Sequence, residues 1–372
     1  MRQGWGAVAA LVLLGACSST PHPKSVATPA AETARDAGLT RVAAPAGAAG
    51  DAALAAFRRS CPALLKRSDA SGLTQPGDWT GPCAAAATAT DAATIFSGFV
   101  PVRIGDGRGL NTGYYEPELA GSLTRAPGYP VPLYKRPPDL IEADLGTFVD
   151  SLKGRKIRGR VQGGAFVPYF DRAEIDAGAL TARGLELAWA ADPYEAFFLE
   201  IQGSGRLRLA DGTVARIGYD GQNGRDYTAI GKLLRERNLL PSGGATMDGI
   251  IGWMKAQPDG GAALMRENRS KIFFRRLPEG DPALGPPGAL GVALTPGVSV
   301  AADPKFVPLG APLWLNGALR VAQDTGGAIR GANRLDLFMG AGAAARAAAG
   351  SLAAQGDAVL LLPPASAARL GL

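Results

Sequence analysis

The stretch QDTGGAIRGANRLDLF, residues 323–338, places Asp324 directly before two glycines and a second acid, Asp336, further along. Strand-forming residues precede Asp324 in ALRVAQD, residues 318–324, and residues without side chains follow it. One interpretation is an ordinary turn, because Asp before Gly is common in turns. The other is a catalytic acid whose surroundings stay open for a bulky substrate. The rest of the chain decides between the two.

Length and composition favour a chain of two β-rich domains. The chain has 372 residues, which is enough to bury more than one core. Its 51 Gly and 28 Pro residues disfavour long helices, and its hydrophobic content of 47% is dominated by Ala and Val. We therefore expect a mainly β fold with few short helices.

The net charge of +6 suits an anionic partner, such as nucleic acid, a membrane surface or an acidic cell-wall polymer. No stripe of arginines interleaved with aromatic residues runs along the sequence, and this disfavours nucleic acid as the partner. Charge alone does not choose between the membrane and the polymer.

Histidine is nearly absent, since the single one is His22 in the tripeptide Pro-His-Pro. A Ser-His-Asp triad, a Cys-His pair and a His-based zinc site are therefore nearly excluded. We expect chemistry that rests on carboxylates, hydroxyls, amides or amines, with no cofactor and no metal.

The amino terminus has the pattern of a secretory signal over residues 1–16, with an apolar run too short to span a bilayer. Leu14-Gly15-Ala16-Cys17 resembles the lipobox of bacterial lipoproteins, in which the Cys is lipidated. The alternative is a simple cleaved signal with an incidental Cys17. In lipoproteins, Ser18 rather than Asp after the Cys implies sorting to the outer membrane.

Residues 17–50 are predicted to be the lipid anchor and a disordered tether, because Ala, Pro, Ser and Thr dominate this segment. Cys61 and Cys83 lie beyond it. In an oxidising compartment the two could pair and pin the start of the folded domain. The alternative of two buried thiols stays open at this point.

Hydrophobic periodicity predicts helices and strands along the rest of the chain. Phe197, Leu199 and Ile201 alternate with Phe198 and Gln202, which predicts a strand. Asp211-Gly212 then predicts a hairpin turn. The other expected helices are 51–67 (interrupted by Pro62), 87–99, 226–238, 247–257 and 342–354, and the other strands are 270–277, 290–301, 311–324 and 357–363. This order favours two small β-barrels over alternating βαβ units.

Three acids at loop positions of the final third are candidates for catalysis: Asp303, Asp324 and Asp336. Asp303 precedes a proline and is more simply explained as a turn former. Asp336 could instead bond the backbone amides of a loop.

The motifs around these acids resemble a known domain. DPKFVPLG (303–310), DTGGAIRG (324–331) and RLDLFMG (334–340), in that order, resemble the 3D domain, which forms a double-psi β-barrel. Further motifs resemble the membrane-bound lytic murein transglycosylase A family over about residues 55–340: TGYYEPELAGS (112–122), YPVPLYKRPPDL (129–140), VPYFDRAEID (167–176), FFLEIQGSGRLRL (197–209), GYDGQNGRDYTAIGKLL (218–234) and ENRSKIFFR (267–275).

The resemblance implies a fold and a single catalytic acid. The family's Asp-x-Gly-Gly-Ala motif assigns that acid to Asp324. A double-psi barrel is expected from residues 51–120 plus 262–372, with a second β-barrel inserted as residues 121–261. A groove between the two barrels would bind the glycan.

The family reaction cleaves the β-1,4 bond between N-acetylmuramic acid and N-acetylglucosamine and leaves a 1,6-anhydro end. It consumes no water, so one carboxylate can act as acid and then as base, unlike the paired acids of ordinary glycosidases. The pKa of Asp324 must then be raised by burial or by a nearby like charge. Asp336 and Asp303 would support it, Asp336 by repulsion or by holding a loop.

The groove needs planar surfaces for sugar faces and polar groups for hydroxyl and acetamido groups. Each candidate taken singly could instead only pack or cap a turn. The expected contacts are Tyr115, Gln202, Ser204, Tyr219, Asn223 and Tyr227, with Lys271 for substrate carboxylates.

Members of the family are outer-membrane lipoproteins that face the periplasm. The resemblance therefore implies peptidoglycan strands as partner, a lipid anchor in the outer membrane, and murein synthases or scaffold proteins as candidate protein partners. Two alternatives stay open. One is a tethered barrel that binds murein without cutting it, and the other is a hydrolytic glucanase with Glu116 or Glu118 as a second essential carboxylate.

Overall fold

The structure is a computed structural model, and it describes residues 31–47, 50–241, 243–244 and 246–372. The predicted signal peptide, Cys17 and the first part of the predicted tether lie outside the described residues.

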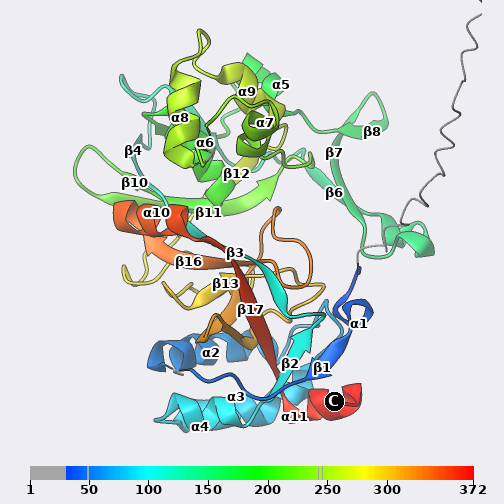
Figure 1. Ribbon diagram of the computed structural model, residues 1–372. Helices are drawn as coiled ribbons and strands as arrows, with labels where there is room; N and C mark the ends of the chain where they lie inside the picture. The colour runs from blue at the N-terminus through cyan, green and yellow to red at the C-terminus, as the bar shows by residue number, and fades with distance from the viewer. Residues whose placement is uncertain (1–30, 48–49, 242, 245) are drawn as a thin grey trace, which may run out of the picture. The chain divides into compact units, whose positions relative to one another are not determined.

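The first sheet closes into a barrel (Figure 1). Six strands form the ring in the order β3-β16-β13-β15-β14-β17, because β17 pairs with both β14 and β3. The pairs β13–β15 and β16–β3 are parallel and the others are antiparallel. The strands of this sheet are β1 (Leu39–Arg41), β2 (Val100–Ile104), β3 (Arg108–Glu116), β13 (Ser299–Ala301), β14 (Pro312–Leu315), β15 (Ala318–Asp324), β16 (Leu335–Ala341) and β17 (Ala353–Leu362). This ring confirms a double-psi barrel built from both ends of the chain.

The hairpin of β14 and β15 shows why these residues form barrel strands. Every residue of β14 is buried, and β15 buries Leu319, Val321 and Gln323. The two strands are joined by Asn316 and Gly317, both with positive φ, which is the turn geometry that matches strand twist. Asp324 is the last residue of β15, so its position is set by a strand that is paired and packed within the barrel.

A second sheet has the order β12-β11-β10-β4-β9-β5 and its own hydrophobic cluster. Its strands are β4 (Glu118–Ser122), β5 (Val131–Tyr134), β9 (Glu186–Ala190), β10 (Ser204–Arg208), β11 (Val214–Gln222) and β12 (Ile272–Arg276). Tyr134 and Phe273, from its two edge strands, share one core cluster, so the edges curl toward each other. The sheet extends past both expected borders of the insert, 121 and 261, because β4 starts earlier and β12 pairs with β11.

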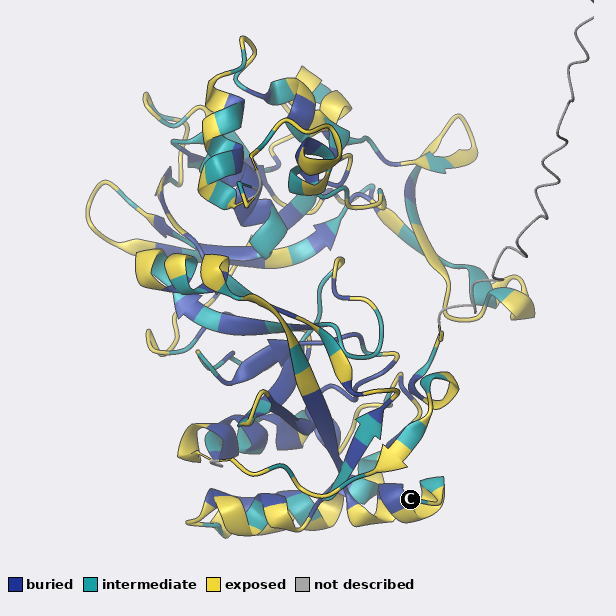
Figure 2. Ribbon diagram, viewed as in Figure 1, coloured by how far each residue is buried: buried dark blue, intermediate teal, exposed yellow. Residues whose placement is uncertain are grey.

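A third, small sheet contains β6 (Ile141–Asp144), β7 (Lys156–Gln162) and β8 (Ala165–Pro168). Residues opposite each other on paired strands point to the same side. Val161 pairs with Phe166, and their side chains are 61% and 40% exposed. Figure 2 shows the contrast between these exposed strands and the buried strands of the first barrel.

Short helices flank the sheets, and the longest that is described, α2, has 14 residues. In Figure 1, α2 to α4 and α11 lie beside the first barrel, and α6 to α9 lie beside the second sheet. The α-helices are α1 (Ala34–Ala37), α2 (Asp51–Leu64), α3 (Thr80–Thr88), α4 (Ala92–Ser97), α5 (Arg172–Glu174), α6 (Pro193–Gln202), α7 (Ile230–Glu236), α8 (Met247–Lys255), α9 (Ala262–Glu267), α10 (Gly342–Ser351) and α11 (Pro364–Leu370). Single turns of other helical types lie at Pro76–Trp79, Leu145–Thr147, Asp150–Leu152 and Ile175–Ala179.

Two segments differ from the predictions. The predicted strand at 197–202 is instead helix α6, which starts at the Asp192 cap and Pro193 and buries both Phe197 and Phe198. The predicted tether does not extend as far as residue 50, because Thr33 caps α1 and β1 pairs with β2. Backbone pairing with the barrel orders β1 despite its tether-like composition.

Cys61 of α2 and Cys83 of α3 form a disulfide, with 5.6 Å between their Cα atoms. The structure thus decides between the two alternatives in favour of the pair. The bridge fixes α3 against the helix that packs on β15.

Candidate active site

Asp324 stands at the end of β15 and its carboxylate accepts three hydrogen bonds. The Tyr114 hydroxyl donates to Oδ2 at 2.8 Å. The backbone N–H groups of Ala289 and Thr325 both donate to Oδ1 at 2.9 Å. The side chain is therefore held in one orientation while the residue stays partly exposed.

One face of strand β3 supplies the contacts to both acids. Thr112 and Tyr114 lie two residues apart and so point to the same side of the strand. The Thr112 hydroxyl donates to Asp336 Oδ1 at 2.6 Å, and Tyr114 reaches Asp324. The Tyr114 ring packs against the Phe338 ring, with 5.3 Å between centroids. The parallel pairing of β3 with β16 creates this alignment.

Burial changes the acidity of these groups. Burial raises the pKa of Asp324 above its usual range, although the donors Ala289, Tyr114 and Thr325 act in the opposite direction. Burial also raises the pKa of Asp336 to about 6, with the negative charge of Asp324 adding to the effect. The pKa of Tyr114 lies well above its ordinary value, through burial first and then the charge of Asp324. Tyr114 therefore keeps its proton, and the shift in the pKa of Asp324 is in the direction that favours the protonated acid.

Asp303 is buried and contacts no other acid of the site among its hydrogen bonds. Its Oδ1 accepts from the Lys305 N–H at 3.1 Å and its Oδ2 from the Gly331 N–H at 2.9 Å. The Lys305 bond belongs to a local turn, and the Gly331 bond attaches this turn to the loop that follows Asp324.

A short hairpin of residues 285–294, the 285–294 hairpin, lies against Asp324. Besides the Ala289 contact, the Leu290 N–H donates to the Gln323 carbonyl at 3.1 Å. A Cβ atom on Gly288 would stand 2.6 Å from that carbonyl and 3.2 Å from the Asp324 Cβ. Glycine is required there, because a Cβ atom would not fit at this close approach of the hairpin to the end of β15.

Gln323 fixes the strand end from the other side. Its Nε2 donates to the Ala56 carbonyl at 2.8 Å and to the Ser60 hydroxyl at 2.9 Å, both on α2. The Ser299 hydroxyl donates to its Oε1. The residue before the acid is thus fully buried and bonded on both ends of its amide.

The two glutamates considered as a second catalytic carboxylate are engaged in ion pairs. Glu116 is fully buried between Arg206 and Arg216, at 2.9 and 3.2 Å. Glu118 pairs with Arg208 at 3.1 Å. Neither makes a hydrogen bond to Asp324 in the described structure, and both carboxylates are occupied by arginines.

Of the seven expected groove contacts, two are clearly exposed. The side chain of Tyr219 on β11 is 47% exposed and that of Tyr227 is 38% exposed. Both present aromatic surface of the kind that stacks on sugar faces.

Three others lie where β3 meets the second sheet. Tyr115 is buried against α10, and its hydroxyl contacts Met247 Sδ at 3.5 Å. Gln202, at the end of α6, accepts from the Tyr115 N–H at 3.1 Å. Ser204 is buried at the start of β10 and pairs with Gly218. The structure places these three residues near one another, but their contacts are with other parts of the chain rather than with an open surface.

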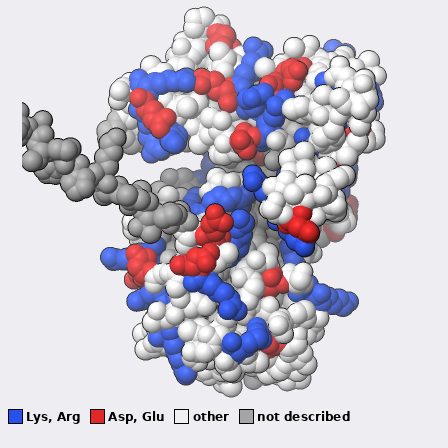
Figure 3. All heavy atoms as spheres, turned by 90° about the vertical axis from the view of Figure 1, so that its right-hand side faces the viewer, with Lys and Arg blue, Asp and Glu red and all other residues white. Residues whose placement is uncertain are grey.

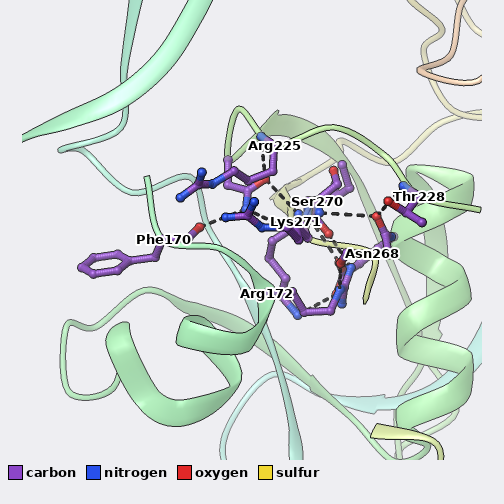
Figure 4. Close-up of polar contacts among 11 residues, drawn as sticks. Phe170, Arg172, Arg225, Thr228, Asn268, Ser270 and Lys271 are labelled. Atoms are coloured by element: carbon purple, nitrogen blue, oxygen red, sulfur yellow. Dashed lines mark hydrogen bonds and ion pairs between the residues drawn. The ribbon is translucent and has the colours of Figure 1, made fainter. Parts of the chain in front are cut away.

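Asn223 and Lys271 belong to a buried polar network, in which the Lys271 N–H donates to Asn223 Oδ1 at 3.0 Å. Figure 4 shows Lys271 in this network beside Arg172 and Ser270. Asn223 Nδ2 donates to the carbonyls of Phe170 and Arg269, both at 2.9 Å. Lys271 Nζ lies 2.7 Å from Glu200, which also pairs with Arg172 at 2.7 Å. Burial alone would raise the pKa of Glu200, but the two cations outweigh it and lower the pKa. In this conformation Lys271 is committed to Glu200.

Tyr114 contacts Asp324 but is not among the site residues predicted from the sequence. Its neighbour Tyr115 was chosen from the same Gly-Tyr-Tyr motif, and the two point to opposite sides of β3. Thr112 and Tyr114 lie on the face of β3 that contacts the two acids. The alternation of side chains along a strand is therefore the sequence signal that pairs Tyr114, rather than Tyr115, with Thr112.

Charges of both signs mix on the surface: Figure 3 shows Lys and Arg side chains beside Asp and Glu side chains on the same face. Over the described ranges, no cluster of three or more His, Cys, Asp or Glu residues could hold a metal ion. In that same part of the chain, none of the helices has the length and hydropathy needed to cross a bilayer.

Comparison with known families matches both parts of the fold. Residues 110–275 match the MltA specific insert domain, and residues 298–362 match the 3D domain. The insert match ends within β12, in agreement with the pairing of that strand with β11.

Curated relatives carry the same assignment. The chain is 36% identical over 199 residues to a membrane-bound lytic murein transglycosylase A of Vibrio cholerae, which covers 48% of this chain and 52% of that protein. It is 30% identical over 248 residues to the protein of that name from Escherichia coli K12, covering 62% and 59%. The chain thus spans little more than half the length of the curated relatives it matches.

Solved structures agree over a larger share. A membrane-bound lytic murein transglycosylase from Agrobacterium tumefaciens has a TM-score of 0.79 and 30% identity, covering 89% of this chain and 99% of that one. MltA from Neisseria gonorrhoeae has a TM-score of 0.69 and 32% identity, covering 87% and 96%. With both domain matches and this coverage, the chain belongs to the family of membrane-bound lytic murein transglycosylase A, with an MltA insert and a 3D domain.

Proposed function

We propose that this protein is a lytic transglycosylase that cleaves the β-1,4 bond between N-acetylmuramic acid and N-acetylglucosamine in peptidoglycan. The product would carry a 1,6-anhydromuramic acid end. Asp324 acts as the single catalytic residue, first as acid and then as base.

The observation that carries this proposal is the setting of Asp324. It is a carboxyl group whose pKa burial raises, held by Tyr114 and two backbone amides. A hydrolase of the usual kind needs a second carboxylate that activates water or attacks the sugar. Asp336 accepts from Thr112 on the neighbouring strand, and Glu116 is bound by two arginines. One acid with no free partner suits a reaction that consumes no water.

The steps balance around one proton. Asp324 donates its proton to the bridging oxygen as that bond to the anomeric carbon breaks. The resulting carboxylate then takes the proton of the muramyl 6-hydroxyl, whose oxygen bonds to the anomeric carbon. Tyr114 can serve both states of Asp324, because a phenol both donates and accepts hydrogen bonds. The enzyme ends the cycle with Asp324 protonated again.

Substrate binding is proposed for the groove between the two sheets, with Tyr219 and Tyr227 as the exposed aromatic surfaces for sugar rings. Tyr115, Gln202, Ser204 and Asn223 would shape the groove from within, since their side chains are engaged in internal contacts or buried. Lys271 would meet a substrate carboxylate only by leaving Glu200.

For location, we propose an outer-membrane lipoprotein facing the periplasm, lipidated at Cys17, which would hold the enzyme beside its polymer. The relatives named above are described as membrane-bound, and this supports a membrane association. Murein synthases or scaffold proteins are the proposed protein partners.

The decisive experiment is digestion of purified murein sacculi with mass analysis of the released muropeptides. The proposal requires products one water lighter than hydrolytic ones. Reducing ends would instead indicate a hydrolase, and absence of release would indicate a barrel that binds without cutting. Asp324→Asn should abolish release and retain binding to sacculi. Asp211→Asn is the matched control, because Asp211 only bonds Thr213 in an exposed turn.

A further inference from the structure

Glu116, Arg206 and Arg216 form a compact ionic cluster where β3 of the barrel meets β10 and β11 of the second sheet. Glu116 Oε2 lies 2.9 Å from Arg206 Nε and 3.2 Å from Arg216 Nη2. The carboxylate is fully buried, and the two arginine side chains are 14% and 13% exposed. Two guanidinium groups offer more donors than one carboxylate can accept.

The remaining donors reach the chain that leads into the 285–294 hairpin. Arg206 Nη2 donates to the Pro282 carbonyl at 3.2 Å and to the Leu284 carbonyl at 3.4 Å. Arg216 Nη2 donates to the same Leu284 carbonyl at 3.2 Å. The base of the hairpin is thus tied to the second sheet by charged donors, which make stronger hydrogen bonds than neutral ones.

The hairpin carries this attachment to Asp324. Gly285 and Leu294 are bonded through the Gly285 N–H at 2.8 Å, and Pro287 bridges to Ala293, so the hairpin is internally braced. Its tip places the Ala289 N–H on Asp324 and leaves no space at Gly288. A shift at the base therefore moves the groups that cover the catalytic acid.

Glu116 also lies on the face of β3 that carries Thr112 and Tyr114, since the three are spaced by two residues. We propose that Glu116, Arg206 and Arg216 are positioning residues that hold the 285–294 hairpin against Asp324 and so control how dry and how well oriented that acid is. Only the kinetic test of this inference rests on the proposed function.

The titratable groups that face Asp324 are Tyr114 from β3 and Asp336 from β16, and the 285–294 hairpin contains no titratable side chain. Loosening the hairpin admits water to Asp324 and weakens the burial that raises its pKa, while loss of the Ala289 N–H bond acts in the opposite direction. Burial is the larger of these two effects, so we expect the pKa of Asp324 to fall. The acid then loses its proton at lower pH. Because Asp324 must start protonated, the basic limb of the pH–activity profile moves to lower pH.

Arg206→Gln and Arg216→Gln test the cluster, with Arg208→Gln as the matched control. Arg208 lies on the same strand as Arg206, pairs with Glu118 and is 66% exposed. With intact enzyme and sacculi as substrate, we expect kcat of the two variants to fall about tenfold through misplacement of the acid. KM should stay within about twofold, as expected when ground-state binding is not lost. The basic limb should move down by about half a pH unit or more, the direction set by lost burial. Arg208→Gln should match the wild type.

Gly288→Ala provides an independent variant, because its added Cβ displaces the hairpin from the Gln323 carbonyl without touching either arginine. It should reproduce the shift in the pH limb. A thermal melt identifies any variant that fails to fold. An unchanged pH profile in folded Arg216→Gln and Gly288→Ala overturns the inference.

Hydrogen exchange separates this inference from the proposed function. The amides of Ala289 and Leu290 are bonded to Asp324 and Gln323, so they should exchange more slowly in the wild type than in Arg206→Gln and Arg216→Gln. Arg208→Gln should leave their exchange unchanged. Equal exchange in all proteins overturns the positioning role. If the wild type releases nothing from sacculi, the proposed function fails and the exchange result still decides whether the cluster holds the hairpin.

Discussion

At the scale of single residues, Tyr114 is the contact that most directly tunes Asp324. Its hydroxyl donates to the carboxylate and thereby favours the ionised form. Tyr114→Phe should raise the pKa of Asp324 further and move the basic limb of activity upward by up to about one pH unit, as expected for a lost bond to a charged group. It should also lower kcat. Tyr115→Phe is the control, because its hydroxyl contacts only Met247 Sδ, on the other side of β3. A limb that moves downward in Tyr114→Phe would contradict this account.

Asp336 gives a prediction about stability. Burial raises its pKa to about 6, so the folded protein keeps a proton that the unfolded chain releases above about pH 4. Rising pH between about 4 and 6 therefore favours unfolding through this group. Asp336→Asn should be more stable than the wild type at pH 7 by about 1 to 3 kcal/mol and similar to it below pH 4. Urea unfolding at the two pH values measures the difference, and a variant less stable at pH 7 would refute the assignment.

The sequence predicts Asp324 as the acid because a motif specifies an acid at a strand end, and the structure places Asp324 at the end of β15. It did not separate Tyr114 from Tyr115, since both are tyrosines and only the register of β3 against β16 decides which one faces the acid. Asn223 and Lys271 look like substrate ligands in sequence, yet both are satisfied internally. Polar residues near a groove motif do not reveal their partners when those partners are distant along the chain.

At the scale of elements, α6 shows where periodicity misleads. Alternation of Phe197, Leu199 and Ile201 predicted a strand, but Phe198 and Glu200 between them are buried as well. When nearly every position of a segment is buried, its hydrophobic pattern does not distinguish a helix from a strand. The residues at the start of the segment then indicate which of the two forms. Asp192 accepts from the N–H groups of Tyr194 and Glu195, and Pro193 occupies the first turn, both of which are helix-start signals.

The bridge between α2 and α3 gives a prediction at this scale. Cys61 follows Ser60, which holds Gln323, so the disulfide restrains the helix behind the catalytic strand. Replacing both cysteines by serine should cost about 3 kcal/mol, through the closed loop between residues 61 and 83. Thermal melts with and without reductant measure this loss. Reductant should lower the Tm of the wild type and leave the double variant unchanged, and equal sensitivity of both would contradict a structural role.

At the scale of the whole molecule, Arg346 connects the two sheets away from the active site. It lies on α10 beside the barrel, 2.8 Å from Glu195 on α6, and it also pairs with Asp248 on α8. Arg346→Gln should cost about 1 kcal/mol, because the pairs are partly exposed. Calorimetry should also show a broader transition as the barrel and the second sheet unfold less cooperatively. Lys232→Gln is the control, since its pair with Glu236 stays within α7. A transition equally sharp in both variants would argue against coupling through Arg346.

The position of β17 in the barrel has a consequence for how the enzyme comes into being. This strand pairs with β14, β2 and β3, and it closes the ring between β14, which lies nearby in the sequence, and β3, which lies near the start of the folded chain. A chain made from its amino terminus can complete the second sheet early, but it cannot close the first barrel until residues 353–362 have emerged. Until then β14 and β3 lack the strand that pairs with both of them. A protein proposed to cut peptidoglycan thus completes the barrel that carries Asp324 only after residues 353–362 are made, and a shorter chain lacks the closed ring.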